Sequence, residues 1–359
     1  MKDYHERMAR NEHKVTIQEI ADMAGVSKST VSRYLNQGYI SEEKAARIRD
    51  VIHETGYKAN FFAKRLKMKE SKLIGVVLPR IDSVTVGKLL TGIGRVLEPR
   101  GYQGLLLSSQ LSSDKELASI RSLAQQGVDG IIVDSLGITD RHVALAKALD
   151  IPVVFTGQQH PDVTWLKLDD YAAGRLMGAY LQQMGHAHAV FLGVNERDQA
   201  VGGERKRGFL DAFLAGREED AGVRIDFVET GFDFLSAYNH GADVEERKDA
   251  GATVAVCATD NIALGLLRYF HERRVRVPED MSVTGFGGYD VSAVVYPALT
   301  TIQFDYDLVG MKTAQMLLHR LGSEDAPQGG MPLHLIERES VKNLGSGETA
   351  AIESFHALT

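Results

Sequence analysis

Lysine, arginine and hydroxyl side chains gather in the short stretch AGVSKSTVSRYLN near the start of the chain. Lys28, Ser29 and Thr30 follow a turn of small residues, and Arg33 lies about one helical turn further on. Long cationic side chains donate hydrogen bonds to guanine edges, whereas serine and threonine contact bases or phosphates. These residue types at this spacing predict contact with a nucleic-acid duplex, and an ordinary surface helical hairpin is the alternative.

Three short helices are expected to position these side chains. Thr16 and Glu19 form the capping-box pattern T-x-x-E at the start of the first helix, and Gly25 suits the left-handed conformation that ends it. Ser27 and Ser41 are candidate N-caps of the second and third helices. Apolar residues at helical spacing supply a small core. The pattern predicts a helix-turn-helix, in which the second helix enters the major groove of DNA.

Charge is divided unevenly along the chain. Residues 1–70 hold 14 Lys and Arg against 10 Asp and Glu, so they contribute +4 to the net charge of −7, and the other residues contribute −11. A basic head on an acidic body indicates that only the head meets a polyanion, and a solvated charged face is the alternative. The single cysteine fits a reducing compartment. The sequence shows no secretory signal and no membrane-spanning run, so we expect a cytoplasmic protein with no membrane contact.

From Lys72 onward, short apolar runs alternate with helical segments. KLIGVVLP, VDGIIVDS and IPVVFTG belong to a first set, and HAVFLGV, TVAVCATD and MSVTGFGG belong to a second. Apolar strands bounded by turns, with helices between them, predict parallel sheets covered on both faces. Two successive sets predict two doubly wound subdomains, with a ligand cleft between them at the carboxyl ends of the strands.

The segment VTIQEIADMAGVSKSTVSRYLN resembles the head of the LacI family, whose motif runs T-I-x-D-V-A-x-x-A-G-V-S-x-x-T-V-S-R-x-L-N. The resemblance extends over residues 14–340 and implies a homodimer that binds a pseudo-palindromic operator in double-stranded DNA. It implies that Lys28, Ser29 and Arg33 face bases. The residues implied to hold phosphates or fix the helix are Thr16, Thr30, Ser32 and Asn36.

The segment GYKANFFAKRLKMK resembles the family's hinge, where a short helix forms on DNA and a leucine wedges into the minor groove. Leu66 matches that leucine, and Asn60 and Ala63 match further hinge positions. Ala59 stands where the family usually has proline, so the hinge is expected to order differently. A leucine that covers the joint between linker and body is the alternative for Leu66.

The second part of the chain is similar to periplasmic sugar-binding proteins, as the bodies of this family are. Strand ends and this resemblance together predict a ligand site made of Arg80, Asp82, Gln158, Arg205, Phe232, Thr259, Asp260 and Tyr306. Planar polar groups bind sugar hydroxyls, and an aromatic ring covers an apolar sugar face. Alternatively, Arg80 and Arg205 bind a phosphate or carboxylate. Structural roles stay open: an ion pair for either arginine, the core for Phe232 and a helix cap for Asp260.

The effector is not determined by the common family pattern. Gly157, Gly287 and Gly288 stand where relatives often carry acidic residues. The segments PRIDS, SSQL, GIT and CATD resemble trehalose repressors most, and GYIS is similar to sucrose repressors of Gram-positive bacteria. The hypothesis is therefore a disaccharide or its 6-phosphate.

The expected fold is an all-α helix-turn-helix head followed by an α/β body of the periplasmic-binding-protein type, with two doubly wound parallel-sheet subdomains. The expected boundaries are 14–57 for the head, 58–71 for the hinge, 72–340 for the body and 341–359 for a tail. Within the body we expect an N-subdomain of about 72–167 and 303–325, and a C-subdomain of about 168–302 and 326–340.

The sequence predicts a transcriptional regulator, most simply a repressor that a sugar or sugar phosphate releases from DNA. A corepressor-dependent regulator that responds to a non-sugar molecule is the alternative. TGIGRVL lacks the third glycine of a dinucleotide site, and His186 and His188 have no further metal ligand nearby in the sequence. Asp169 and Asp170 precede a helix and are expected to cap it. We therefore expect no catalytic activity, no cofactor and no metal.

Overall fold

Two compact units, Met1–Ser71 and Lys72–Thr359, divide the chain at the end of the expected hinge. The structure, a computed structural model, describes residues 15–35, 38–57, 70–217, 222–323 and 325–345. Four residues of the expected DNA site lie outside this described part: Asn36, Asn60, Ala63 and Leu66.

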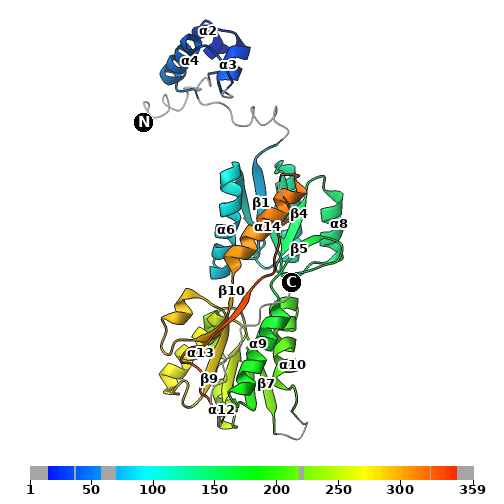
Figure 1. Cartoon of the computed structure of the whole chain (residues 1–359), viewed down its shortest axis with the longest axis vertical. Helices are drawn as coiled ribbons and strands as arrows, with labels where there is room; N and C mark the ends of the chain where they lie inside the picture. Colours follow the sequence, from blue (N-terminus) through cyan, green and yellow to red (C-terminus); the bar gives the residue numbers. More distant parts are fainter. Residues whose placement is uncertain (1–14, 36–37, 58–69, 218–221, 324, 346–359) are drawn as a thin grey trace, which may run out of the picture. The chain divides into compact units, whose positions relative to one another are not determined.

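The described part of the head forms three helices, drawn in blue in Figure 1. They are α2 (Ile17–Met23), α3 (Lys28–Leu35) and α4 (Glu42–Thr55). The capping box at α2 is present: the Glu19 backbone N–H donates to Thr16 Oγ1 at 3.3 Å, and the Glu19 carboxylate accepts from the Thr16 N–H at 2.7 Å. Gly25 has φ +62° and turns the chain toward α3.

Buried apolar side chains hold the three helices of the head together. Ile20 comes from α2, Val31 from α3, and Ile48 and Val51 from α4. Val31 is the only fully buried side chain of α3 among those described, Tyr34 and Leu35 pack beside it, and Lys28, Ser29 and Arg33 are exposed. Ser41 precedes α4, as expected, but its side chain makes no capping hydrogen bond there.

The body contains two sheets. The first has the order β2-β1-β3-β4-β5 and is parallel throughout. Its strands are β1 (Leu73–Leu78), β2 (Gln103–Ser108), β3 (Gly130–Asp134), β4 (Val153–Thr156) and β5 (Thr164–Leu166). The second has the order β11-β10-β9-β8-β6-β7. Its strands are β6 (His188–Gly193), β7 (Arg224–Glu229), β8 (Val254–Cys257), β9 (Ser282–Gly287), β10 (Thr300–Phe304) and β11 (Leu333–Ile336).

The expected alternation of strands and helices is present, with one exception to the parallel pattern: β11 pairs antiparallel with β10. The helices of the body are α6 (Val84–Leu97), α7 (Ser113–Gln125), α8 (Asp140–Ala148), α9 (Asp170–Gln183), α10 (Lys206–Phe213), α11 (Phe234–Asn239), α12 (Gly241–Asp249), α13 (Asp260–Arg273) and α14 (Tyr306–Arg320). Short helical turns of other types are η1 (Glu98–Arg100), η2 (Gln199–Arg205), which is a π-helix, and η3 (Asp290–Ala293).

The first sheet is covered on both faces. Alternate residues of its strands join two separate apolar clusters, so Val76 belongs to the cluster on one face and Val77 to the cluster on the other. Helices α6 and α14 lie side by side over one face (Figure 1). They approach closely because both carry glycine at the contact: a Cβ atom added to Gly92 would lie 1.9 Å from the Asp307 carbonyl oxygen.

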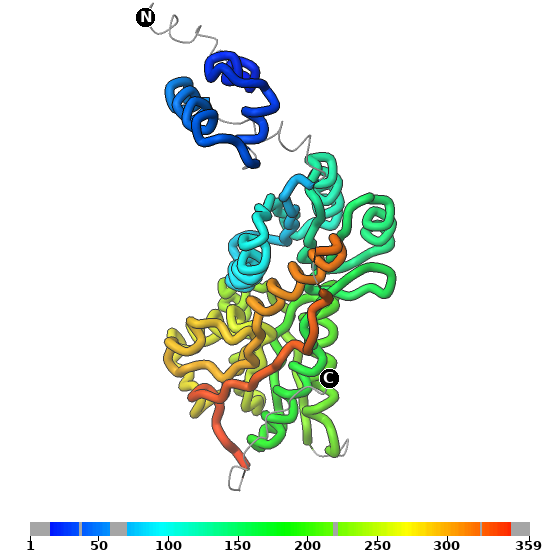
Figure 2. The backbone as a smooth tube through the Cα atoms, turned by 45° about the horizontal axis from the view of Figure 1, so that its top comes forward, coloured from blue at the N-terminus to red at the C-terminus, as the bar shows by residue number. Residues whose placement is uncertain are grey.

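The chain crosses between the two sheets three times. It passes from β5 to α9, from β10 to α14, and from α14 back to β11. The last of these crossings is the orange-to-red path in Figure 2. We expected the second crossing at residue 303, but β10 continues in the second sheet to Phe304. The apolar cluster on the α14 side of the first sheet continues into the second, so the two halves share a core.

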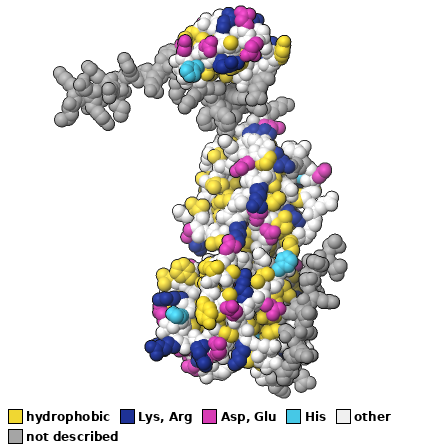
Figure 3. Space-filling model, turned by 60° about the vertical axis from the view of Figure 1, so that its left-hand side comes forward, with side chains coloured by type: hydrophobic (Ala, Val, Ile, Leu, Met, Phe, Trp, Pro, Cys, Tyr) yellow, Lys and Arg dark blue, Asp and Glu magenta, His cyan; other side chains and the backbone are white. Residues whose placement is uncertain are grey.

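The described end of the chain packs on the body, and this packing includes the first described residues of the segment that we expected as a tail, 341–359. Ser340 is buried and donates to the Val283 carbonyl oxygen at 2.6 Å. The Leu344 N–H donates to the Met184 carbonyl oxygen at 2.7 Å. Basic and acidic side chains lie interspersed over the face of the body seen in Figure 3. Within the described residues, no helix has the length and apolar character needed to cross a bilayer.

Candidate functional site

The start of α3 presents the cationic and hydroxyl side chains that the sequence singled out. Lys28, Ser29 and Arg33 are exposed, and all three lie on α3, whose buried side chain is Val31. The aliphatic part of Arg33 lies against the backbone at Gly38, where an added Cβ would come within 2.6 Å of Arg33 Cγ. This contact limits the directions that the guanidinium can take, while its charge stays accessible to a ligand.

Hydroxyl groups fix the geometry where α3 begins. Ser27 Oγ lies 2.8 Å from both Ser29 Oγ and Thr30 Oγ1, and it accepts from the Thr30 N–H at 3.2 Å. Thr30 and Ser32 are half-buried. The Thr16 hydroxyl donates to the Glu19 carboxylate at 2.9 Å and so belongs to the capping box of α2. Phosphate contacts by Thr16, Thr30 and Ser32 stay predictions.

The body holds a cavity of about 200 Å³ at the carboxyl ends of strands from both sheets. The first half contributes loops after β1, β3 and β4, and the second half contributes η2 and the loops after β7, β8 and β9. Six of the eight predicted ligand residues line it: Arg80, Gln158, Arg205, Phe232, Thr259 and Tyr306. The structure therefore brings together side chains up to 226 positions apart in the sequence, from Arg80 to Tyr306.

Two of the predicted ligand residues, Asp82 and Asp260, do not line the cavity. Asp82 accepts two hydrogen bonds from Arg80, at 2.7 Å from Nε and 3.0 Å from a terminal nitrogen, and these bonds lower the pKa of the Asp82 carboxyl. Its role in the structure is to hold the guanidinium of a cavity residue. The ligand contact of Asp82 itself stays a prediction.

Asp260 is completely buried at the start of α13. One carboxylate oxygen accepts from the Thr301 hydroxyl at 2.6 Å, and the other accepts from the Ser292 hydroxyl at 2.7 Å and from the Tyr289 N–H at 2.8 Å. These bonds tie β10, η3 and the loop after β9 to α13. Both of its oxygens thus accept hydrogen bonds inside the second half, and ligand binding by Asp260 stays a prediction.

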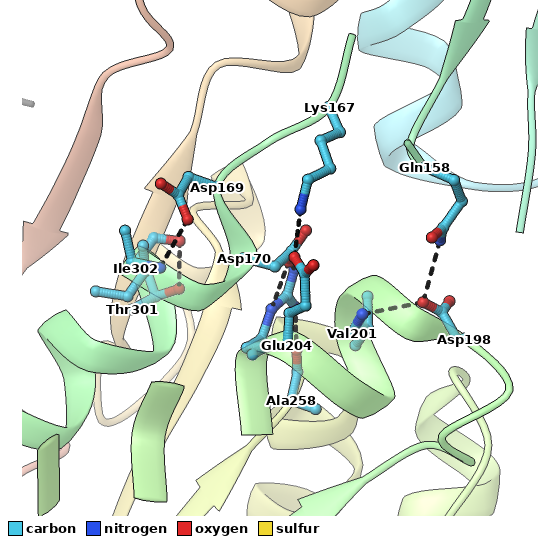
Figure 4. A network of polar contacts seen from close by, with 12 residues as sticks. Gln158, Lys167, Asp169, Asp170, Asp198, Val201, Glu204, Ala258, Thr301 and Ile302 are labelled. Atoms are coloured by element: carbon cyan, nitrogen blue, oxygen red, sulfur yellow. Dashed lines mark hydrogen bonds and ion pairs between the residues drawn. The ribbon is translucent and has the colours of Figure 1, made fainter. Parts of the chain in front are cut away.

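Arg205 forms the most deeply buried ion pair of the cavity wall (Figure 4). Its Nε donates to Asp170 Oδ1 at 3.0 Å, a terminal nitrogen donates to the same oxygen, and the other terminal nitrogen donates to the Ala258 carbonyl oxygen. The rings of Phe286 and Phe304 lie 5.0 Å from the guanidinium carbon. Asp170 was expected to cap α9, but that role belongs to Asp169, which accepts from the Ala172 N–H.

Sequence reasoning missed three acids that line the cavity: Asp170, which it expected only as a helix cap, and Asp134 and Asp198. Asp134 ends β3, and the rule that ligands lie at carboxyl ends of strands would have identified it. Asp198 caps η2 and faces Gln158, whose Nε2 donates to it at 3.5 Å across the cavity (Figure 4). Asp198 lies in the short loop between β6 and η2, and no local motif marks it as the partner of Gln158, because the two come from different halves of the body.

Two tyrosines, Tyr289 and Tyr306, complete the polar lining. Burial raises the pKa of both phenols, so both hydroxyls keep their protons at neutral pH and can donate hydrogen bonds. Phe232 is half-buried and offers an apolar surface beside them. This combination of neutral donors, acids and aromatic surface suits a ligand that has both polar edges and an apolar face.

The Asp134 carboxyl makes stability depend on pH. Burial, with Glu116 and Asp198 nearby, raises its pKa to about 7. Because this value lies above that of an unfolded aspartate, about 3.9, the folded state holds the proton more tightly. The stability that protonation contributes is complete below pH 4 and is lost as pH rises through 7.

The free energy of unfolding of the natural chain should therefore fall by about 1–3 kcal/mol more between pH 4 and pH 8 than that of the Asp134→Asn variant. Urea unfolding of the body at a series of pH values measures this difference. Asp114→Asn is the matched control, since it makes the same change at an exposed acid on α7. Parallel curves for Asp134→Asn and the natural chain would contradict the prediction.

Comparisons with known proteins agree with this architecture. Residues 16–60 match the bacterial regulatory proteins of the lacI family, and residues 179–341 match the periplasmic binding protein-like domain. The sucrose operon repressor of Staphylococcus xylosus is 34% identical over 311 residues, which cover 85% of this chain and 94% of that one. The repressor PurR of Pectobacterium carotovorum is 31% identical, with 91% and 96% covered.

Solved structures show the same fold. The lac repressor dimer bound to operator and the anti-inducer ONPF has a TM-score of 0.81 at 22% identity, covering 91% of this chain and 99% of that one. A complex of the regulator CelR with cellobiose has a TM-score of 0.65 at 25% identity, with the same shares covered. The chain belongs to the LacI family of bacterial regulatory proteins, because residues 16–60 match that family and the sucrose operon repressor is 34% identical over 94% of its own length.

Proposed function

We propose that this chain is a homodimeric transcriptional repressor of a sugar-utilisation operon, released from a pseudo-palindromic operator by a sugar or sugar phosphate bound in the cavity of the body. One observation carries the proposal: a single chain joins exposed cationic and hydroxyl side chains on α3 to a cavity lined by hydrogen-bonding groups and an aromatic ring. A relative named as a sucrose operon repressor and a structural neighbour bound to cellobiose support a carbohydrate effector.

A dimer follows from the size of the head. One head with a single reading helix makes a small interface, whereas specific protein–DNA complexes bury about 1,000–2,500 Å² of protein surface. Two heads on a symmetric operator double that area and fix the half-site spacing. The dimeric state of the lac repressor on its operator supports this arrangement. The proposed place of action is the bacterial cytoplasm, on chromosomal DNA.

The cavity couples ligand to DNA because its wall comes from both halves of the body. Gln158 belongs to the first half and Asp198 to the second, and a ligand between them contacts both. Such a ligand stabilises one arrangement of the halves over others, and in the proposed dimer that arrangement sets the spacing of the two hinges. Coupling of this kind typically amounts to about 1–3 kcal/mol, or roughly 5–150-fold in operator affinity. The relatives are transcriptional regulators, and we propose that the ligand is bound without chemical change.

Fluorescence anisotropy with duplexes selected from random sequence tests this function. We expect the full chain to prefer a palindromic duplex, to lose affinity steeply with added salt, and to release the duplex when an effector sugar is added. Phe232→Ala is the matched control, since it changes the cavity and should keep operator binding while it weakens the sugar response. If a ligand strengthens binding instead, the chain is a corepressor-dependent regulator; if no palindromic duplex is preferred, the proposal fails.

A further inference from the structure

The charged side chains of the cavity wall differ in whether they are paired with a side chain of opposite charge. Among the described residues, the charged side chains that line it are Arg80, Asp134, Asp170, Asp198 and Arg205. Arg205 is paired with Asp170, and Arg80 is paired with Asp82 outside the lining. Each of the two arginines therefore already has a carboxylate partner before a ligand enters, whereas no ion pair within the described residues involves Asp134 or Asp198.

Asp134 stands at the end of β3 with its carboxylate toward the cavity. Within the part of the chain that the structure describes, no group donates a hydrogen bond to it. The absence of a side chain at Gly157 leaves room beside it, because an added Cβ there would lie 3.1 Å from Asp134 Oδ1. A partly desolvated carboxyl without a protein donor is ready to accept hydrogen bonds from a ligand.

Asp198 faces the same space from the second half. Its Oδ1 accepts from the Val201 N–H at 2.9 Å and, at 3.5 Å, from the amide of Gln158. No donor among the described residues reaches its other oxygen. Burial raises the pKa of Asp198, as it does that of Asp134. The ligand space thus lies between two acids, one from each half.

We infer that the cavity takes an uncharged polyhydroxylated ligand and excludes its phosphorylated form, with Asp134 and Asp198 as the residues that determine this specificity. This inference rests on the proposed function and narrows its effector. Ligand hydroxyls donate to the two carboxyls, and the tyrosine hydroxyls and Thr259 supply complementary groups. A phosphate would bring about two negative charges into a space that already holds two acids, and both arginines of the described lining already have carboxylate partners.

Calorimetry on the full chain tests the inference. Glucose, sucrose and trehalose are each compared with the corresponding 6-phosphate at pH 7.5. We expect at least one neutral sugar to bind and its phosphate to bind at least tenfold more weakly. A phosphate that binds as tightly as its parent sugar, or a panel in which no neutral sugar binds, would overturn the inference.

Isosteric variants show whether the two acids cause the discrimination. Asp134→Asn and Asp198→Asn should each weaken binding of the neutral sugar by at least fivefold. Each should also reduce the ratio of the affinity for the sugar to the affinity for its 6-phosphate by at least threefold. A purely structural role would lower both affinities equally and leave the ratio unchanged, which would also overturn the inference. Asp114→Asn, an exposed acid on α7, is the control and should leave both affinities as they are.

The operator assay separates this inference from the proposed function. Release of the operator by a sugar phosphate, but not by its parent sugar, would refute the specificity inferred here and leave the chain a sugar-responsive repressor. Failure to prefer any palindromic duplex would refute the repressor itself, whatever the calorimetry shows. Release by the neutral sugar alone supports both.

Discussion

Replacing Arg33 with alanine is expected to weaken operator binding by about 1–3 kcal/mol for each half-site, roughly 5–150-fold, and to relax base preference at the position it reads. Arg33 is exposed on α3, and its aliphatic part rests on the backbone at Gly38, so the guanidinium is presented outward. Competition between the selected duplex and single-base variants measures both effects. Sugar affinity should stay the same, because Arg33 and the cavity belong to separate units.

A charge-matched control distinguishes base reading from general attraction. Lys44→Ala removes an exposed cation from α4 of the same head. It should weaken binding to all duplexes to a similar small extent and leave the order of preference among them unchanged. If Arg33→Ala gave the same uniform result, or bound its operator as well as the natural chain does, α3 would not be the reading helix.

Replacing Asp170 with alanine should destabilise the body by about 3–5 kcal/mol, because it leaves the buried guanidinium of Arg205 without its carboxylate. Both side chains are almost completely buried, and two nitrogens of Arg205 donate to Asp170. The midpoint of urea unfolding, followed by a probe of the body, measures the loss. Combining it with Arg205→Met should recover part of the stability, since the unpaired charge is then gone.

An exposed ion pair provides the comparison for this prediction. Asp82→Ala breaks the pair with Arg80, and Asp82 lies at the surface, so the unfolding midpoint should hardly move. The prediction for Asp170 would be contradicted by a midpoint equal to that of Asp82→Ala, or by a double variant less stable than Asp170→Ala alone. Either result would mean that water or rearrangement compensates the buried arginine.

The head was the most predictable part of the fold because local signals determine it. Thr16 and Glu19 are three residues apart, and the capping box they predict is present. Ser27 likewise contacts residues within three positions of itself. The strands of the body were predictable for a related reason: a strand buried on both faces is apolar at nearly every position, as β1 is.

The location of the cavity was predictable from the sequence, but only some of the residues that line it were. Strand ends located Gln158 and Tyr306, since topology alone brings carboxyl ends together. The partners of Asp170 and Asp260 were not predictable, because their hydrogen bonds reach 29 to 41 positions along the chain and depend on tertiary packing. An acid at a strand end or before a helix has the same local sequence whether it caps the helix, pairs with arginine or faces a ligand.

The position of α14 in the sequence has a consequence for synthesis on the ribosome. Its buried residues cover one face of the first sheet, yet they are translated after β6 to β10. At about 5–20 residues per second, roughly ten to thirty seconds separate the emergence of β5 from that of α14. During that interval the nascent first half exposes an apolar surface, which makes it a natural client for a chaperone. Premature termination before α14 would leave this surface permanently open to aggregation.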